Sequence, residues 1–82
     1  MSTDLDAAWD AVHDAKPDRW YVGRPTDYGT GRGWVMYAFD RTERAVMGHR
    51  SGEWMAVGAS ELEVVRQMAR CLAIIREGGT PT

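Results

Sequence analysis

The chain has 82 residues, which is enough for one small domain with a modest hydrophobic core. Ten basic and twelve acidic residues give a formal net charge of −2, which excludes a generally polybasic nucleic-acid binder but not a local basic patch. A single cysteine, Cys71, excludes an intrachain disulfide and a cysteine-based metal cluster. The N-terminus lacks a basic start, and no segment reaches the ~20 apolar residues of a membrane span, so we expect a cytoplasmic protein.

The first predicted element is an amphipathic helix over residues 4–15. Its apolar side chains recur at the spacing of one helical face: Leu5, Ala8, Trp9, Val12 and Ala15. Thr3 or Asp4 can accept hydrogen bonds from the free N–H groups of the first turn. Pro17 disfavours helical geometry at Lys16 and therefore ends the helix there.

The middle of the chain predicts short strands separated by turn residues. Strands are expected at residues 19–24, 34–39 and about 44–49. A loop rich in Gly, Thr and Asp covers residues 25–33, and a tight turn covers 40–43. Residues 53–57 predict either a fourth strand or the continuation of the third strand beyond a bulge.

A second helix is predicted from Ser60 to about Glu77. Ser60 and Glu63 have the capping-box spacing, in which each side chain bonds the backbone N–H of the other residue. The apolar face of this helix is centred on Val65, Met68, Leu72 and Ile75. Two glycines then stop the helix, and we expect the tail over residues 78–82 to be disordered.

This order of elements predicts a single α+β domain over residues 1–82, with an ordered core at about 4–77. Short turns between strands require antiparallel pairing, so a three- or four-stranded antiparallel sheet is expected, flanked by an N-terminal and a C-terminal helix. Two helices on one face of the sheet give a two-layer sandwich. Helices that straddle the sheet are the alternative.

The strand predicted over residues 34–39 is apolar on both of its sides. Alternation divides its side chains into two sets: Trp34, Met36 and Ala38, and Val35, Tyr37 and Phe39. If both helices cover one face, an aromatic strip remains on the other, and such strips mark partner sites. We therefore predict a non-enzymatic module that binds protein, including a second copy of itself as a homodimer, through a strip around Trp34, Tyr37 and Phe39. Ile74, on the polar side of the last helix, is a further candidate contact.

The arginines provide an alternative hypothesis. Residues 16–50 hold seven basic against four acidic residues, a net charge of +3, whereas residues 1–15 hold four acidic residues and no basic one. Five arginines belong to the predicted sheet and its loops: Arg24, Arg32, Arg41, Arg44 and Arg50. Arginines and aromatic rings on one sheet suit phosphate contact and base stacking, which favours a nucleic-acid-binding accessory domain. The competing interpretation is that the acidic first helix pairs with these arginines.

No catalytic or metal-binding pattern emerges from the sequence. His13 and His49 are the only histidines, and neither has the ligand spacing of a metal site with Cys71. No nucleophile–base pair can be nominated, so we expect no enzymatic activity, cofactor or metal. The glycines between Gly29 and Gly33 lead into a strand and do not open a helix, which favours a hairpin loop over a phosphate-binding loop.

The element order over residues 4–77 resembles that of double-stranded-RNA-binding domains. In that family the final helix begins with a lysine-rich motif that contacts phosphate, whereas residues 60–63 here are Ser-Glu-Leu-Glu. Residues 19–77 also resemble the small three-stranded arm-binding domains of phage-type integrases, which are basic. Both resemblances concern topology alone and assign no family.

Overall fold

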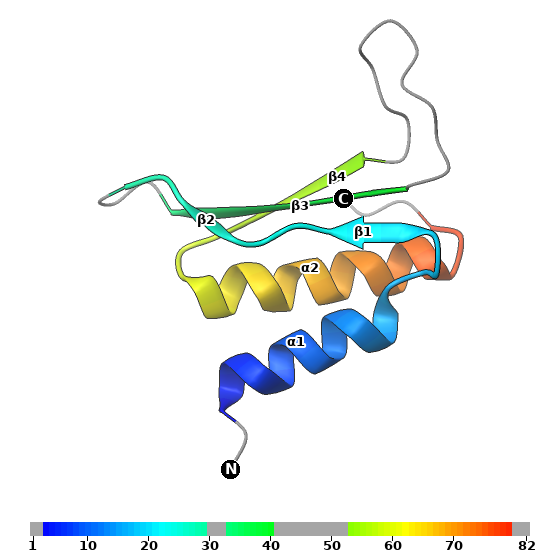
Figure 1. Ribbon diagram of the computed structural model, residues 1–82, viewed down its shortest axis with the longest axis horizontal. Coiled ribbons are helices and arrows are strands. Elements are labelled where there is room, and N and C mark those ends of the chain that lie inside the picture. The colour runs from blue at the N-terminus through cyan, green and yellow to red at the C-terminus, as the bar shows by residue number, and fades with distance from the viewer. Residues whose placement is uncertain (1–2, 30–32, 41–52, 80–82) are drawn as a thin grey trace, which may run out of the picture.

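A computed structural model describes residues 3–29, 33–40 and 53–79. The elements in chain order are α1 (Asp4–Ala15), β1 (Trp20–Val22), β2 (Thr26–Asp27), β3 (Trp34–Asp40), β4 (Glu53–Gly58) and α2 (Glu61–Arg76). Both helices lie on the same side of the sheet (Figure 1). The predicted α+β class, with two helices and an antiparallel sheet, is therefore confirmed.

β3 is the central strand of the four-stranded sheet. β4 pairs antiparallel with it from Trp34↔Gly58 to Phe39↔Glu53. The other side of β3 is shared by two short strands: β1 pairs with its C-terminal part and β2 with its N-terminal end. All pairings are antiparallel, so every strand position is fixed by its register with β3.

Several element boundaries differ from those expected. The helix over residues 4–15 is confirmed, whereas β1 is shorter than the predicted strand over 19–24. Thr26–Asp27 forms β2, so the prediction of a loop throughout 25–33 was wrong. Thr26 lies opposite Val35, and this long-range pairing overrides the local turn preference of the segment. The strand predicted at 44–49 lies outside the described residues.

The helix ends show how local hydrogen bonds fix the elements. Thr3 and Asp6 form a reciprocal capping box, with N···O distances of 3.1 and 3.2 Å. Ser60 Oγ accepts from the Glu63 N–H at 3.2 Å, as predicted, but the Glu63 carboxylate accepts from the N–H of Ala59 and not from that of Ser60.

The first two residues of the expected disordered tail instead close α2. Gly78 has a φ of 87°, which is accessible to glycine at little cost. Its N–H donates to the carbonyl of Ile75, and the N–H of Gly79 donates to the carbonyl of Ile74. This pair of bonds is the Schellman arrangement that satisfies the last carbonyls of a helix. Residues 80–82 lie outside the described residues.

The hydrophobic core lies between the helices and the sheet. Its largest fully buried side chains are Met36, Met68, Leu72, Val12, Val64 and Val65. Trp9, Trp20 and Trp34 are half-buried and pack against this cluster, so three of the four tryptophans contribute to the core. Cys71 is 3% exposed and is, as predicted, a small buried hydrophobic side chain.

Gly58 sits at the junction where β4 turns into α2. A Cβ atom at this position would lie 2.6 Å from the backbone nitrogen of Val64 and 3.0 Å from the backbone carbon of Glu63. Backbone atoms of a capped helix cannot move aside as the end of a side chain can, so overpacking here strains the junction.

We expect Gly58→Ala to lower the free energy of unfolding by about 2–3 kcal/mol, measured by chemical denaturation. The control is Gly23→Ala, whose Cβ would meet the Tyr37 carbonyl oxygen at an ordinary 3.4 Å. That variant should change the free energy of unfolding by less than about 1 kcal/mol. Equal effects of the two substitutions would contradict the close approach of β4 and α2.

Candidate functional site

The side of the sheet opposite the helices carries a continuous group of apolar and aromatic side chains. We call it the open face and define it by Tyr21, Val35, Tyr37, Phe39, Met55 and Val57. Three cross-strand pairs build it: Tyr21↔Phe39, Tyr37↔Met55 and Val35↔Val57. Directly paired residues point to the same side of a sheet. Met36 and Ala38 are fully buried in the core, so the residues between and beside them point away from the helices.

Most of the open face is accessible to solvent. Val57 is 59% exposed, Tyr21 50%, Met55 49% and Tyr37 41%. Phe39 is half-buried, and its ring lies 5.2 Å from that of Tyr21 at an interplanar angle of 42°. These exposed fractions are high for side chains of this size and hydrophobicity, and exposed apolar patches of a few hundred Å² mark contact sites.

Tyr28 extends the open face beyond the end of β2. It is 54% exposed and forms a side-chain hydrogen bond with Tyr37. The turn that carries it is held by two bonds: Asp27 Oδ1 accepts from the Gly29 N–H at 2.9 Å, and the Tyr28 N–H donates to the Gly33 carbonyl at 3.1 Å. These bonds hold the backbone at Tyr28 at one end of the open face.

The electrostatics of the open face are dominated by hydroxyl groups. The hydrogen bond with Tyr28 raises the pKa of Tyr37 above its ordinary value of 10.0. Coulombic repulsion from Tyr28, desolvation and the negative charge of Glu53 raise the pKa of Tyr37 further. Tyr37 is therefore protonated and neutral throughout the physiological range of pH.

The structure does not bring together the four residues predicted for an interaction strip. Tyr37 and Phe39 lie on the open face, but Trp34 points to the helix side and packs against the core. Alternation explains this separation, because Trp34 shares its side of β3 with Met36 and Ala38. Ile74 is 36% exposed on α2, which covers the other face of the sheet (Figure 1).

Sequence reasoning missed three members of the open face: Tyr21, Met55 and Val57. Their exposure depends on which residues of β1 and β4 lie opposite Tyr37 and Phe39, and that register is a long-range property. The alternation within residues 53–57 was the available signal, because it separates Met55 and Val57 from Ala56.

The arginines predicted to contact phosphate fall mostly outside the described residues. Arg24 is described and is exposed just after β1. Four others are not described: Arg32, Arg41, Arg44 and Arg50. The predicted basic surface is therefore represented in the structure by Arg24 alone, and the hypothesis remains a prediction.

A polar hollow lies at the C-terminal end of α1 and has a structural role. Arg76 donates to the carbonyl of Asp14 at 2.6 Å and so joins α2 to α1. Lys16 donates to the carbonyl of Trp20 at 3.0 Å and joins the end of α1 to β1. Both of these cationic side chains are therefore hydrogen-bonded to backbone carbonyls.

The histidines give no metal site within the described part of the chain. His13 stacks on Trp9 with ring centroids 6.0 Å apart, and His49 lies outside the residues that the structure describes. Among the residues that the structure describes, no group of three or more His, Cys, Asp or Glu side chains could hold a metal ion. No helix in these same residues is long and apolar enough to cross a membrane.

No protein-family model, curated protein or solved structure matches this chain.

We expect Tyr28→Phe to lower the pKa of Tyr37 towards 10.0, because the hydrogen bond that holds Tyr37 protonated is lost. The measurement is tyrosinate absorbance during an alkaline titration, with Tyr21→Phe as the control that retains the bond. A raised pKa in the folded state means that this contribution to stability is complete below pH 10 and is lost as the pH rises through the folded value. The stability of the wild-type protein should accordingly fall more steeply above pH 10 than that of Tyr28→Phe. An unchanged Tyr37 titration would refute the Tyr28–Tyr37 bond.

Proposed function

We propose that the protein is a non-enzymatic binding module whose open face pairs with the open face of a second copy. The observation that carries this proposal is a group of exposed side chains, Tyr21, Tyr37, Met55 and Val57, on the side of the sheet that no described element covers. Their cross-strand partners Phe39 and Val35 lie on the same side and are half-buried and buried, respectively. Twofold association is the commonest oligomeric arrangement, and it requires a surface that complements itself.

The area of the open face suits a small dimer interface. An aromatic side chain offers about 150–250 Å² when fully buried. At their exposed fractions, the accessible side chains supply roughly 450 Å² of contact area in each copy, or about 900 Å² in the pair. These side chains are Tyr21, Tyr28, Tyr37, Met55 and Val57. This approaches the ~1,000 Å² of the smallest specific interfaces, so a weak dimer with a Kd on the order of 10–100 μM is expected.

The chemistry of the open face also supports pairing with itself. Its six defining side chains are apolar or carry a hydroxyl group, and Glu53, which is paired with Phe39, adds one acidic side chain at its edge. Where these six side chains meet in two copies, they bring no like-charge repulsion. Tyrosine suits such contacts, since it combines a large apolar ring with a hydroxyl that can bond across the interface. Two sheets packed in this way would lie ~10 Å apart.

We expect Val57→Glu to weaken dimerisation at least about tenfold, because the contact would bury an unpaired carboxylate. Sedimentation equilibrium measures the change, and circular dichroism checks that the fold persists. Ile74→Glu is the matched control, since it adds the same charge at an exposed apolar residue of α2 that lies off the open face. The proposal fails if the wild-type chain stays monomeric at millimolar concentration, or if both variants weaken association equally.

Nucleic-acid binding is a second candidate function, favoured by one specific observation. Tyr21 and Phe39 place two adjoining rings on an accessible sheet face, which is the arrangement on which bases stack. Against it, the described part of the open face includes the acidic Glu53 and no arginine.

Salt dependence separates the two functions. Phosphate contacts weaken steeply with added salt, whereas apolar association persists. We expect random single- and double-stranded oligonucleotides to leave the fluorescence anisotropy of the chain unchanged at low salt. Binding that disappears at high salt would instead favour the second candidate.

A further inference from the structure

Among the residues that the structure describes, the outer edge of β4 has no strand paired with it. The Gly23 N–H donates to the Tyr37 carbonyl at 2.8 Å, so the backbone of Tyr37 faces β1 and not β4. Along an antiparallel strand the N–H and C=O groups of successive residues turn to alternate sides. The residues of β3 that bond β4 are therefore those on either side of Tyr37, namely Met36 and Ala38.

The same alternation determines which backbone groups of β4 are free. Ala56 and Trp54 lie opposite Met36 and Ala38 and exchange hydrogen bonds with them. Glu53, Met55 and Val57 consequently turn their N–H and C=O groups to the outer edge. Within the described residues β4 pairs with β3 and with no other strand. Such an edge is a template for another extended chain.

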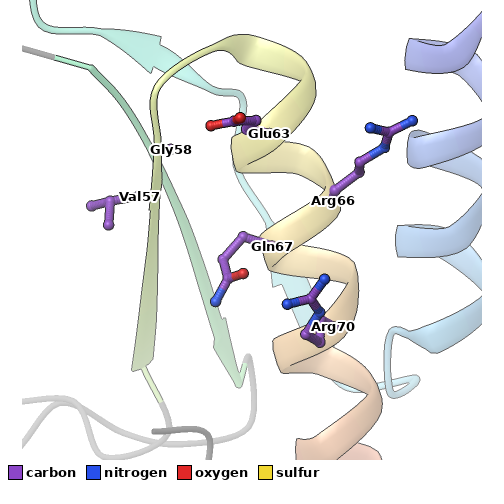
Figure 2. A pocket seen from close by; sticks show the side chains of 6 residues that line it. All are labelled: Val57, Gly58, Glu63, Arg66, Gln67 and Arg70. Atoms are coloured by element: carbon purple, nitrogen blue, oxygen red, sulfur yellow. The ribbon is translucent and has the colours of Figure 1, made fainter.

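A groove runs beside this edge, between β4 and α2 (Figure 2). Its volume is about 210 Å³, and its lining residues are Val57, Gly58, Glu63, Arg66, Gln67 and Arg70. Figure 2 shows Glu63 and Gln67 projecting from α2 towards β4. A strand added to β4 would thus have the sheet on one side and α2 as the second wall.

The charge of the groove favours an acidic occupant. The Glu63 carboxylate accepts from the Ala59 N–H at 3.0 Å and is engaged in capping α2. Arg66 and Arg70 lie one helical turn apart and are exposed. Neither bonds a carboxylate of the described residues. A guanidinium group readily forms paired hydrogen bonds with a carboxylate.

We propose that the β4 edge binds an extended acidic segment of another protein, which adds antiparallel to β4 as a fifth strand. Backbone bonds to Glu53, Met55 and Val57 fix the register, while acidic side chains on the helix side of the new strand reach Arg70. Arg66, one turn earlier, adds positive charge near the groove, although its side chain is turned away from β4 (Figure 2). This mode supplies affinity through the main chain and specificity through alternate side chains. It uses the backbone edge of β4, whereas the open face uses side chains of the same strand, and it does not depend on dimerisation there.

A second copy of the chain is a poorer occupant of this edge. Antiparallel pairing of two β4 strands about a twofold axis keeps both helix layers on the same side of the enlarged sheet. The arginine pairs of both copies would then face one another across the axis, and like charges that meet in this way oppose association. An acidic partner meets no such repulsion.

The test uses a blocked hexapeptide of alternating valine and glutamate, titrated into the wild-type protein by isothermal calorimetry. In an antiparallel addition, a peptide residue whose backbone amide faces β4 has its side chain on the side of the open face. A peptide residue whose backbone amide points away from β4 has its side chain on the side of α2. With glutamates towards α2, methylating the valine amides should weaken binding at least about tenfold, since each blocked bond is lost. Methylating the glutamate amides should leave binding nearly unchanged.

Variants of the protein provide the second readout. Arg70→Gln should weaken binding about threefold to tenfold, whereas Arg19→Gln, an exposed arginine outside the groove, should have no effect. A peptide with lysine in place of glutamate should bind at least about tenfold more weakly than the glutamate peptide. The proposal is overturned if the two methylation patterns have equal or reversed effects. It is overturned equally if the lysine peptide binds as well as the glutamate peptide, or if the glutamate peptide does not bind.

Discussion

The alternation of side chains along β3, held in register by strands on both sides, is the constraint on which the rest of the structure depends. Met36 and Ala38 are fully buried beneath the helices, so Tyr37 and Phe39 must point to the opposite side. Pairing with β1 and β4 then places Tyr21 and Met55 beside them. A one-residue shift of β4 would exchange its buried and exposed side chains, which is why burial of Ala56 fixes the exposure of Met55 and Val57.

The small size of the chain explains why the sheet keeps one exposed apolar side. A domain of about 80 residues buries roughly 60–65% of the surface that its unfolded chain exposes, and two helices supply one covering layer. Tryptophan is concentrated on the covered side, where Trp9, Trp20 and Trp34 contact the core. Tyrosine occupies the other side. The two aromatic types thus divide the sheet into a stabilising side and an accessible side.

Local sequence patterns were sufficient to predict the helices and the central strand. Capping residues and apolar spacing act over a few positions, so the bounds of α1 followed from Thr3 and Pro17. Two-residue alternation likewise separated Tyr37 from Met36. Pairing between strands could not be predicted in this way, because it depends on residues that are distant in the sequence. β2 consists of Thr26 and Asp27, which have no strand pattern and become a strand because β3 lies beside them.

The candidate sites were predictable to a smaller extent, for the same physical reason. Tyr37 and Phe39 were found because they belong to one strand, whereas Tyr21, Met55 and Val57 join them through register. Which backbone groups of β4 face the outer edge depends on how hydrogen bonds alternate across β1, β3 and β4. No pattern in the sequence encodes that alternation. Trp34 was predicted to belong to the interaction strip because it is apolar. Alternation along β3 places it instead on the side covered by the helices.

Methyl NMR over a series of protein concentrations tests most directly whether the open face is the contact surface of the protein. If open faces pair, the methyl signals of Met55 and Val57 shift with concentration, at low and at high salt alike, while those of the buried Val12 and Leu72 stay fixed. Methyl shifts that do not change with concentration, or that change at Ile74 and not at Met55 and Val57, would contradict that pairing.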